Sequence, residues 1–137
     1  MTTRTPDGVA AVPVLALGET LLVSLQGELH DSLAEQLQHD IARRIAHSEA
    51  TGVIIDISGV EIVDSFLGRV LAEIAASAGL LAARTVLAGM RPAVAITLVE
   101  LGLTLPGLAT ALDVERALEL LAQTSAPSAS DGRERGT

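Results

Sequence analysis

Residues 52–71 spell GVIIDISGVEIVDSFLGRVL, and this stretch sets the fold class. Its first part, residues 53–57, is a nearly unbroken run of β-branched residues, which is typical of a strand buried on both faces of a parallel sheet. Gly59 then marks a turn, and Asp64 fits the N-cap of a helix that we expect over residues 65–78. A strand, a turn and a helix in this order predict an α/β unit.

The segments on either side continue this alternation of strands and helices. Upstream, two short strands flank a turn at Gly18, and Ser32 with Glu35 fits a capping box at the start of a helix. Downstream, Pro92 and Gly102 bracket another helix, because proline is favoured at the first helical position and glycine just past the end. The remaining expected elements are strands over residues 13–17, 21–26, 84–88 and 108–112, closure of the first helix at Gly52, and a last helix capped by Asp113.

The predicted element order is β-β-α-β-α-β-α-β-α, which favours one α/β domain with a mixed, mostly parallel sheet. A chain of 137 residues suits a single domain. We expect a flexible N-terminus over residues 1–11, the domain over residues 12–122, and a disordered polar tail over residues 123–137, where Ser, Pro and Gly are frequent.

The composition excludes several classes of site. There is no cysteine, so a disulfide framework and thiolate chemistry are excluded. Phe66 is the one aromatic residue and the formal net charge is −8, so nucleic acid and anionic membranes are not expected partners. The apolar stretch over residues 92–112 contains Glu100 and Pro106, which favours a buried core over a membrane span. No signal peptide is indicated, and we expect a cytoplasmic protein.

Ser65 is the main candidate for a functional residue. It falls in the first turn of the expected helix, where the positive end of the helix dipole tolerates an added phosphate. Arg69 lies one turn further on and can pair with such a phosphate. On its spacing alone, Ser65 is better explained as a common first-turn serine with no further role than as a switch.

A second functional hypothesis is that Ser65 is a catalytic nucleophile. It needs a positioned general base and an oxyanion site. The sequence has no Gly-x-Ser-x-Gly motif around Ser65, and its histidines are spaced unlike a metal or catalytic set. These histidines are His30, His39 and His47.

Acidic pairs around the same turn raise the question of a metal site. Asp56 with Asp64, or Glu61 with Asp64, has the oxygen donors that Mg²⁺ prefers. Helix capping and exposed turn carboxylates explain these residues without a metal. We therefore expect neither a metal nor a cofactor, and no enzyme activity.

The set of motifs as a whole resembles the STAS domains of the bacterial stressosome, in particular small antagonists of the RsbS type. The stretch over residues 52–71 carries the resemblance together with VPVLALGETLLVSLQGEL, TVLAGMRPAVAITLVELGL and TALDVERALELL, over residues 12–29, 85–103 and 110–121. In simpler anti-anti-sigma factors a second small hydroxyl residue and a glycine typically follow the serine. Here Phe66 and Leu67 follow, which favours the stressosome type.

The resemblance implies a function in bacterial stress signalling by partner switching. It implies that a GHKL-type serine/threonine switch kinase phosphorylates Ser65, with Asp64 and Asp56 at the family's acidic positions. The protein would assemble with itself and with RsbR-type sensor STAS paralogues, sequester the kinase and release it once phosphorylated. A PP2C-type phosphatase would reset the serine. Two alternatives are an anti-anti-sigma factor that binds an anti-sigma kinase directly and a structural scaffold subunit.

A partner surface follows from combining the resemblance with helical phase. We expect Phe66 to anchor the helix in the core, and Ser65, Gly68, Arg69 and Ala72 to form an exposed face on which the kinase lies. Phosphate adds a charge of about −1.5 to −2 and opposes a desolvated contact. The expected partner-binding residues are Asp64, Ser65, Phe66, Gly68, Arg69 and Ala72.

Overall fold

A computed structural model describes residues 12–27, 29–103, 105 and 107–125. The five strands form one sheet in the order β1-β2-β3-β4-β5. β1 pairs with β2 in antiparallel fashion, and the other neighbouring strands are parallel. The strands are β1 (Val14–Leu17), β2 (Thr20–Gln26), β3 (Gly52–Gly59), β4 (Arg84–Ala88) and β5 (Leu108–Ala111). The predicted element order and the mostly parallel sheet are confirmed.

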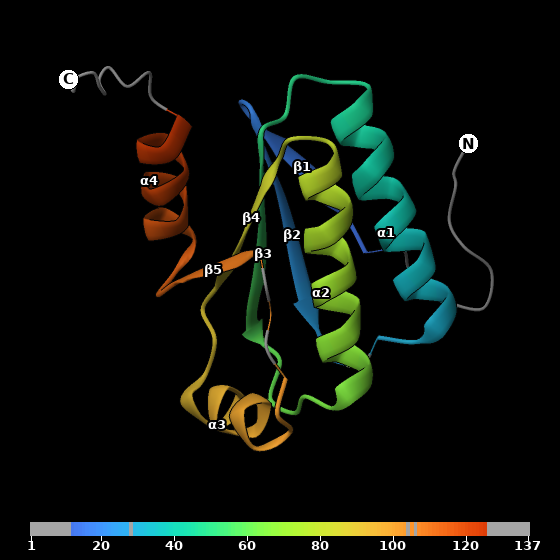
Figure 1. The fold of residues 1–137 in the computed structure, drawn as a ribbon, viewed down its shortest axis with the longest axis vertical. Helices are drawn as coiled ribbons and strands as arrows, with labels where there is room; N and C mark the ends of the chain where they lie inside the picture. Colours follow the sequence, from blue (N-terminus) through green and yellow to red (C-terminus); the bar gives the residue numbers. More distant parts are fainter. Residues whose placement is uncertain (1–11, 28, 104, 106, 126–137) are drawn as a thin grey trace.

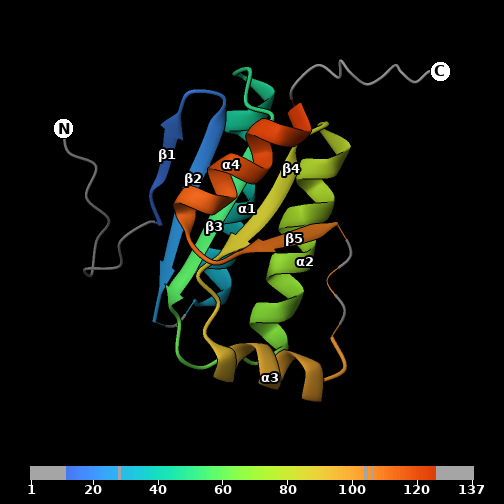
Figure 2. The same cartoon turned by 90° about the vertical axis from the view of Figure 1, so that its left-hand side faces the viewer.

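Helices cover both faces of the sheet, as Figure 1 shows. α1 (Asp31–Ala46) and α2 (Ser65–Leu80) lie together on one face, and α4 (Val114–Ser125) lies on the other. In Figure 2, α4 crosses β3 and β4 and leaves β1 uncovered. α3 (Pro92–Glu100) lies beyond the carboxyl end of β3, close to the start of α2.

The core is aliphatic, as the composition requires. On the α1 and α2 side, Val53, Ile55 and Ile57 of β3 pack with buried residues of both helices. On the α4 side, Ile54 packs with Ala117 and Leu121 of α4. Alternate residues of β3 thus serve two cores, which explains why the β-branched run is nearly continuous.

Most helix boundaries agree with the sequence, with two clear exceptions, both in α1. Closure of this helix at Gly52 is wrong, because α1 ends at Ala46 and Gly52 is the first residue of β3. The capping box predicted at Ser32 and Glu35 is wrong, because Ser32 already lies inside α1. The amide of Ala34 donates to the carbonyl of His30 at 2.8 Å, so the first turn closes earlier and His30 becomes the N-cap. α2 runs two residues beyond its predicted end, to Leu80.

In the second half of the chain, α3 begins and ends where predicted, and α4 begins where predicted. Pro92 is in the first turn of α3, and Gly102, with φ +70°, lies just past its end. Asp113 accepts a hydrogen bond from the amide of Arg116 at 2.8 Å and so caps α4. α4 continues through Ser125, whereas the sequence assigned residues 123–125 to the tail; residues 1–11 and 126–137 lie outside the described part.

The apolar stretch over residues 92–112 contains α3 and β5. Within the described residues, no helix is both long and apolar enough to cross a bilayer.

Candidate functional site

Ser65 begins α2 at the carboxyl-end edge of the sheet, where the loop after β3 turns back. Asp64 is the N-cap of this helix, as predicted, and its Oδ1 accepts a hydrogen bond from the amide of Leu67 at 2.9 Å. The amide of Gly68 donates to the Asp64 carbonyl at 3.1 Å and closes the first turn. The hydroxyl-bearing residue of this turn is thus held on a capped helix end with its side chain exposed.

The predicted contact face is only partly present on the surface. Ser65 and Arg69 are exposed, and Ala72 is half-buried. Gly68 is buried, so its predicted place on the exposed face is wrong. A Cβ at Gly68 would come within 2.5 Å of Leu103 Cδ1, which shows that the segment after α3 covers this side of α2.

Phe66 connects the helix start to the core. Its side chain is half-buried and packs against the large aliphatic cluster, in agreement with the predicted anchoring role. Phe66 also lines a cavity of about 520 Å³ beside Ser65, together with residues of the loop after β2 and of the loop after β3. The other lining residues are Gly27, Leu29, Gly59, Glu61, Ile62, Asp64 and Leu67.

Ile62 is a surface residue that sequence reasoning missed. Its side chain is 84% exposed in the loop that leads to Ser65. An aliphatic residue between Glu61 and Val63 looks like another core position in the sequence, and only its exposure marks it as a contact candidate. Exposed apolar side chains next to a hollow are typical of interaction sites when they cluster.

The end of β3 and the loop over residues 60–64 are also fixed by contacts with other segments. The amide of Ser58 donates to Asp56 Oδ1 at 2.9 Å, so Asp56 shapes the turn. Arg91 reaches the loop from the start of α3: its Nε donates to the Ser58 carbonyl at 3.0 Å, and its Nη1 lies 3.9 Å from Glu61 Oε2. No motif or spacing in the sequence singles out Arg91.

Two of the acidic residues around the turn accept hydrogen bonds from backbone amides. Asp56 accepts from the Ser58 amide and Asp64 caps α2, as expected for turn and cap carboxylates. Across the described residues there is no group of three or more His, Asp or Glu side chains placed to hold a metal ion. The three histidines are exposed, and His30 occupies the N-cap position of α1.

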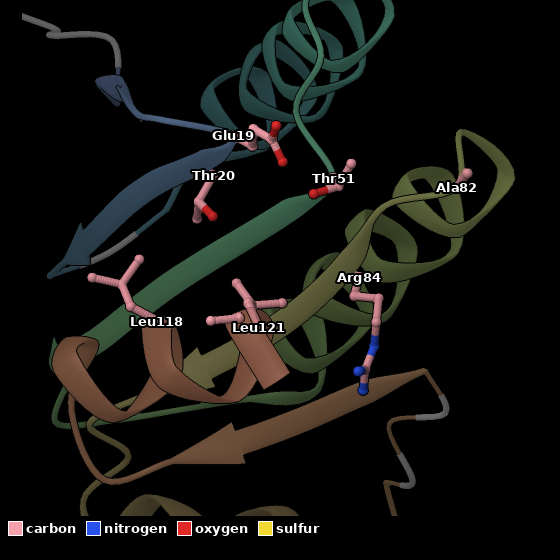
Figure 3. Close-up of a pocket in the computed structure, with 8 residues that line it drawn as sticks. Glu19, Thr20, Thr51, Ala82, Arg84, Leu118 and Leu121 are labelled. Atoms are coloured by element: carbon pink, nitrogen blue, oxygen red, sulfur yellow. The ribbon is translucent and has the colours of Figure 1, made fainter. Parts of the chain in front are cut away.

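A second cavity, of about 360 Å³, lies at the opposite end of the sheet, where β3 and β4 begin (Figure 3). Leu118 and Leu121 of α4 form its apolar wall, facing Thr20 and Thr51. The Arg84 side chain extends away from Glu19, so the two charged groups do not converge on one point. This cavity therefore offers no assembled polar site.

The family follows from comparison with known proteins. The model of the STAS domain matches residues 11–117 of the chain. The chain belongs to the STAS domain family. This match covers every described element except residues 118–125 of α4, so the STAS domain accounts for the whole sheet and for the Ser65 turn.

Among STAS proteins, the chain is similar to components of the stressosome. A serine-to-glutamate variant of Moorella thermoacetica RsbS is 40% identical, with a TM-score of 0.73, over 83% of this chain and 97% of that one. A chain in a structure of the stressosome, described as a signal integration and transduction hub, is 41% identical, with a TM-score of 0.73, over 83% and 99%. The resemblance found in the sequence is confirmed.

A longer STAS protein is also similar. RsbRA of Bacillus subtilis, named as an RsbT co-antagonist protein, is 26% identical over 110 residues, which is 80% of this chain. The chain spans only 40% of the length of RsbRA.

The cap at the start of α2 makes a testable contribution to stability. Replacing Asp64 with alanine removes the acceptor for the Leu67 amide, and we expect the free energy of unfolding to fall by about 1 kcal/mol. Asp64→Asn keeps an oxygen at the cap and should remain within a few tenths of a kcal/mol of wild type. Urea unfolding monitored by circular dichroism measures both; equal losses for the two variants would contradict a capping role.

Proposed function

We propose that this STAS domain is a non-catalytic, cytoplasmic regulator of stress signalling that binds a serine/threonine switch kinase through the surface around Ser65. In this proposal phosphorylation of Ser65 releases the kinase. The observation that supports it best is the exposed Ser65 on the Asp64-capped start of α2, in a chain 40% identical to RsbS.

The surface around Ser65 suits a partner that must sense one hydroxyl group. Arg69 and Ala72 continue the accessible side of α2, while Ile62 and the cavity beside Phe66 offer apolar contact area. A neutral hydroxyl can be covered by the kinase at little cost. A phosphate of about −1.5 to −2 charge would have to lose its hydration in the same contact, which favours release.

The same phosphate is compatible with the fold of the domain itself. It would lie at the amino end of a helix of 16 residues, where the dipole and the unpaired amides favour an anion. Arg69 follows one turn later and is exposed, so it can approach the phosphate. Release of the kinase then needs no unfolding of the domain, only a change of charge at the contact.

The remaining partners follow from the same proposal. The GHKL-type kinase would be shared with RsbR-type sensor paralogues, with which this chain would assemble into a stressosome-like complex, and a PP2C-type phosphatase would remove the phosphate. Similarity to RsbS, to a stressosome chain and to RsbRA supports this set of partners. A pure scaffold would instead assemble with the paralogue irrespective of Ser65 phosphorylation, which size-exclusion chromatography of both forms distinguishes.

The site of phosphorylation gives the first test. Incubation with the cognate switch kinase and ATP is expected to add one phosphate, found by mass spectrometry on Ser65. Ser65→Ala should abolish the modification, while Ser58→Ala, which alters another exposed serine near the end of β3, should leave it in place. A phosphate on a different residue, or no phosphate on the wild-type chain, would rule the proposal out.

A further inference from the structure

The turn between β4 and α3 packs directly against the end of β3, from which the loop to Ser65 starts. Gly89 lies in this turn with φ +75°, and a Cβ at this position would come within 2.9 Å of Ser58 Cβ and 3.2 Å of Asp56 Oδ1. Its own amide donates to the Ala111 carbonyl of β5 at 3.1 Å. The turn is therefore fixed to the sheet and leaves no space between itself and the end of β3.

Arg91 makes the polar contact between the start of α3 and the end of β3. Its Nε donates to the carbonyl of Ser58, 33 residues earlier, at 3.0 Å. The ion pair with Glu61 is long, at 3.9 Å, and joins side chains that are 50% and 73% exposed, so it contributes little. The hydrogen bond to Ser58 is thus the contact by which Arg91 can fix the loop.

The backbone of Arg91 is fixed in turn by α3. Arg91 is the N-cap of this helix, and its carbonyl accepts hydrogen bonds from the amides of Val94 and Ala95, at 2.9 and 3.0 Å. Beyond the other end of α3, Leu103 covers Gly68 in the first turns of α2. The α3 segment therefore contacts the chain both before and after Ser65.

We propose that Arg91 is a positioning residue for Ser65: its Nε holds the Ser58 carbonyl near the end of β3 and so fixes the start of the loop that presents Ser65 to the kinase. The inference rests on the proposed function, because it takes Ser65 as the modified residue. Arg91 acts through the loop and does not itself have to touch the kinase. Loss of the Nε donor should leave the sheet intact and loosen residues 58–64.

Three variants separate the hydrogen bond from the charge. Arg91→Met keeps the side chain as far as the position of Nε and removes every donor. Arg91→Gln loses the charge but places an amide NH₂ at the position along the side chain that Nε occupies in arginine. Arg84→Met is the matched control, because Arg84 is an exposed arginine at the opposite end of β4.

Amide hydrogen exchange of the full chain measures the order of the loop. The informative amides are those of Ser58, bonded to Asp56, and of Val60, bonded to the Ile57 carbonyl at 3.0 Å. We expect both to exchange about fivefold faster in Arg91→Met, as for loss of one hydrogen bond, and within twofold of wild type in Arg91→Gln and Arg84→Met. Unchanged exchange in Arg91→Met, or equal acceleration in Arg91→Gln, overturns the proposal.

The kinetics of phosphorylation test whether the order of the loop affects the reaction at Ser65. Because a less ordered loop lowers the fraction of molecules ready to bind, the KM of the cognate kinase for Arg91→Met should rise about twofold or more, with kcat unchanged and with rescue by Arg91→Gln. If wild type is phosphorylated on Ser65 and Arg91→Met gives the same KM, the positioning role is wrong. If wild type is not phosphorylated at all, the proposed function fails instead, while the exchange experiment still tests the loop contact.

Discussion

Replacing Ser65 with aspartate is expected to weaken binding of the switch kinase by at least about 30-fold, whereas Ser65→Ala should bind as tightly as wild type. Ser65 is exposed at the start of α2, so a carboxylate there would be buried by the bound kinase. Burying an uncompensated charge in a contact costs roughly 2 kcal/mol or more, which corresponds to the stated loss of affinity. Isothermal titration calorimetry with the purified kinase measures the effect.

A charge elsewhere on the domain provides the control for this experiment. Thr51 is exposed at the other end of β3, so Thr51→Asp adds the same charge far from Ser65. This variant should bind the kinase within about twofold of wild type, since exposed charges are screened over a Debye length of about 8–10 Å. Equal weakening by the two substitutions would indicate a general effect of net charge, and equal affinity of Ser65→Asp and Ser65→Ala would contradict the switch.

Truncating Leu71 to alanine is expected to lower the free energy of unfolding by about 3 kcal/mol. Leu71 is 0% exposed on the inner side of α2, within the aliphatic cluster shared with α1 and the sheet. Removing a buried leucine side chain loses its transfer free energy and leaves a cavity, with typical losses of about 2–5 kcal/mol. Urea unfolding at equilibrium measures the change.

The same substitution at Leu80 is the matched control. Leu80 is the last residue of α2 and is 89% exposed, so Leu80→Ala should alter the stability by less than about 0.5 kcal/mol. A similar loss at both positions would mean that Leu80 is covered in solution and that this end of α2 belongs to an interface.

The fold was predictable because its signals are local. The β-branched run of β3, the cap at Asp64 and the bracket of Pro92 and Gly102 each lie within a few residues of the element they define. Ser65 was found for the same reason, since it lies beside its own cap. The start of α1 shows the limit of such reasoning: a capping box predicts Ser32 as the N-cap, but the N-cap is His30, two residues earlier.

The parts of the site that escaped prediction depend on contacts between distant segments. Helical phase placed Gly68 on the surface, but Leu103 from beyond α3 covers it. Arg91 donates a hydrogen bond to the carbonyl of Ser58, 33 residues earlier, and no spacing in the sequence predicts that contact. Ile62 has an aliphatic side chain typical of a core residue and is nevertheless 84% exposed. Tertiary packing alone determines these positions.

A comparison of the two states of the wild-type protein requires no substitution. The dissociation constant of the kinase complex would be measured with the unmodified chain and with the chain phosphorylated on Ser65, after mass spectrometry confirms the modification in each sample. We predict tight binding of the unmodified chain, a loss of at least about 30-fold on phosphorylation, and full recovery after phosphatase treatment. The same dissociation constant for both forms would contradict a phosphorylation switch at Ser65.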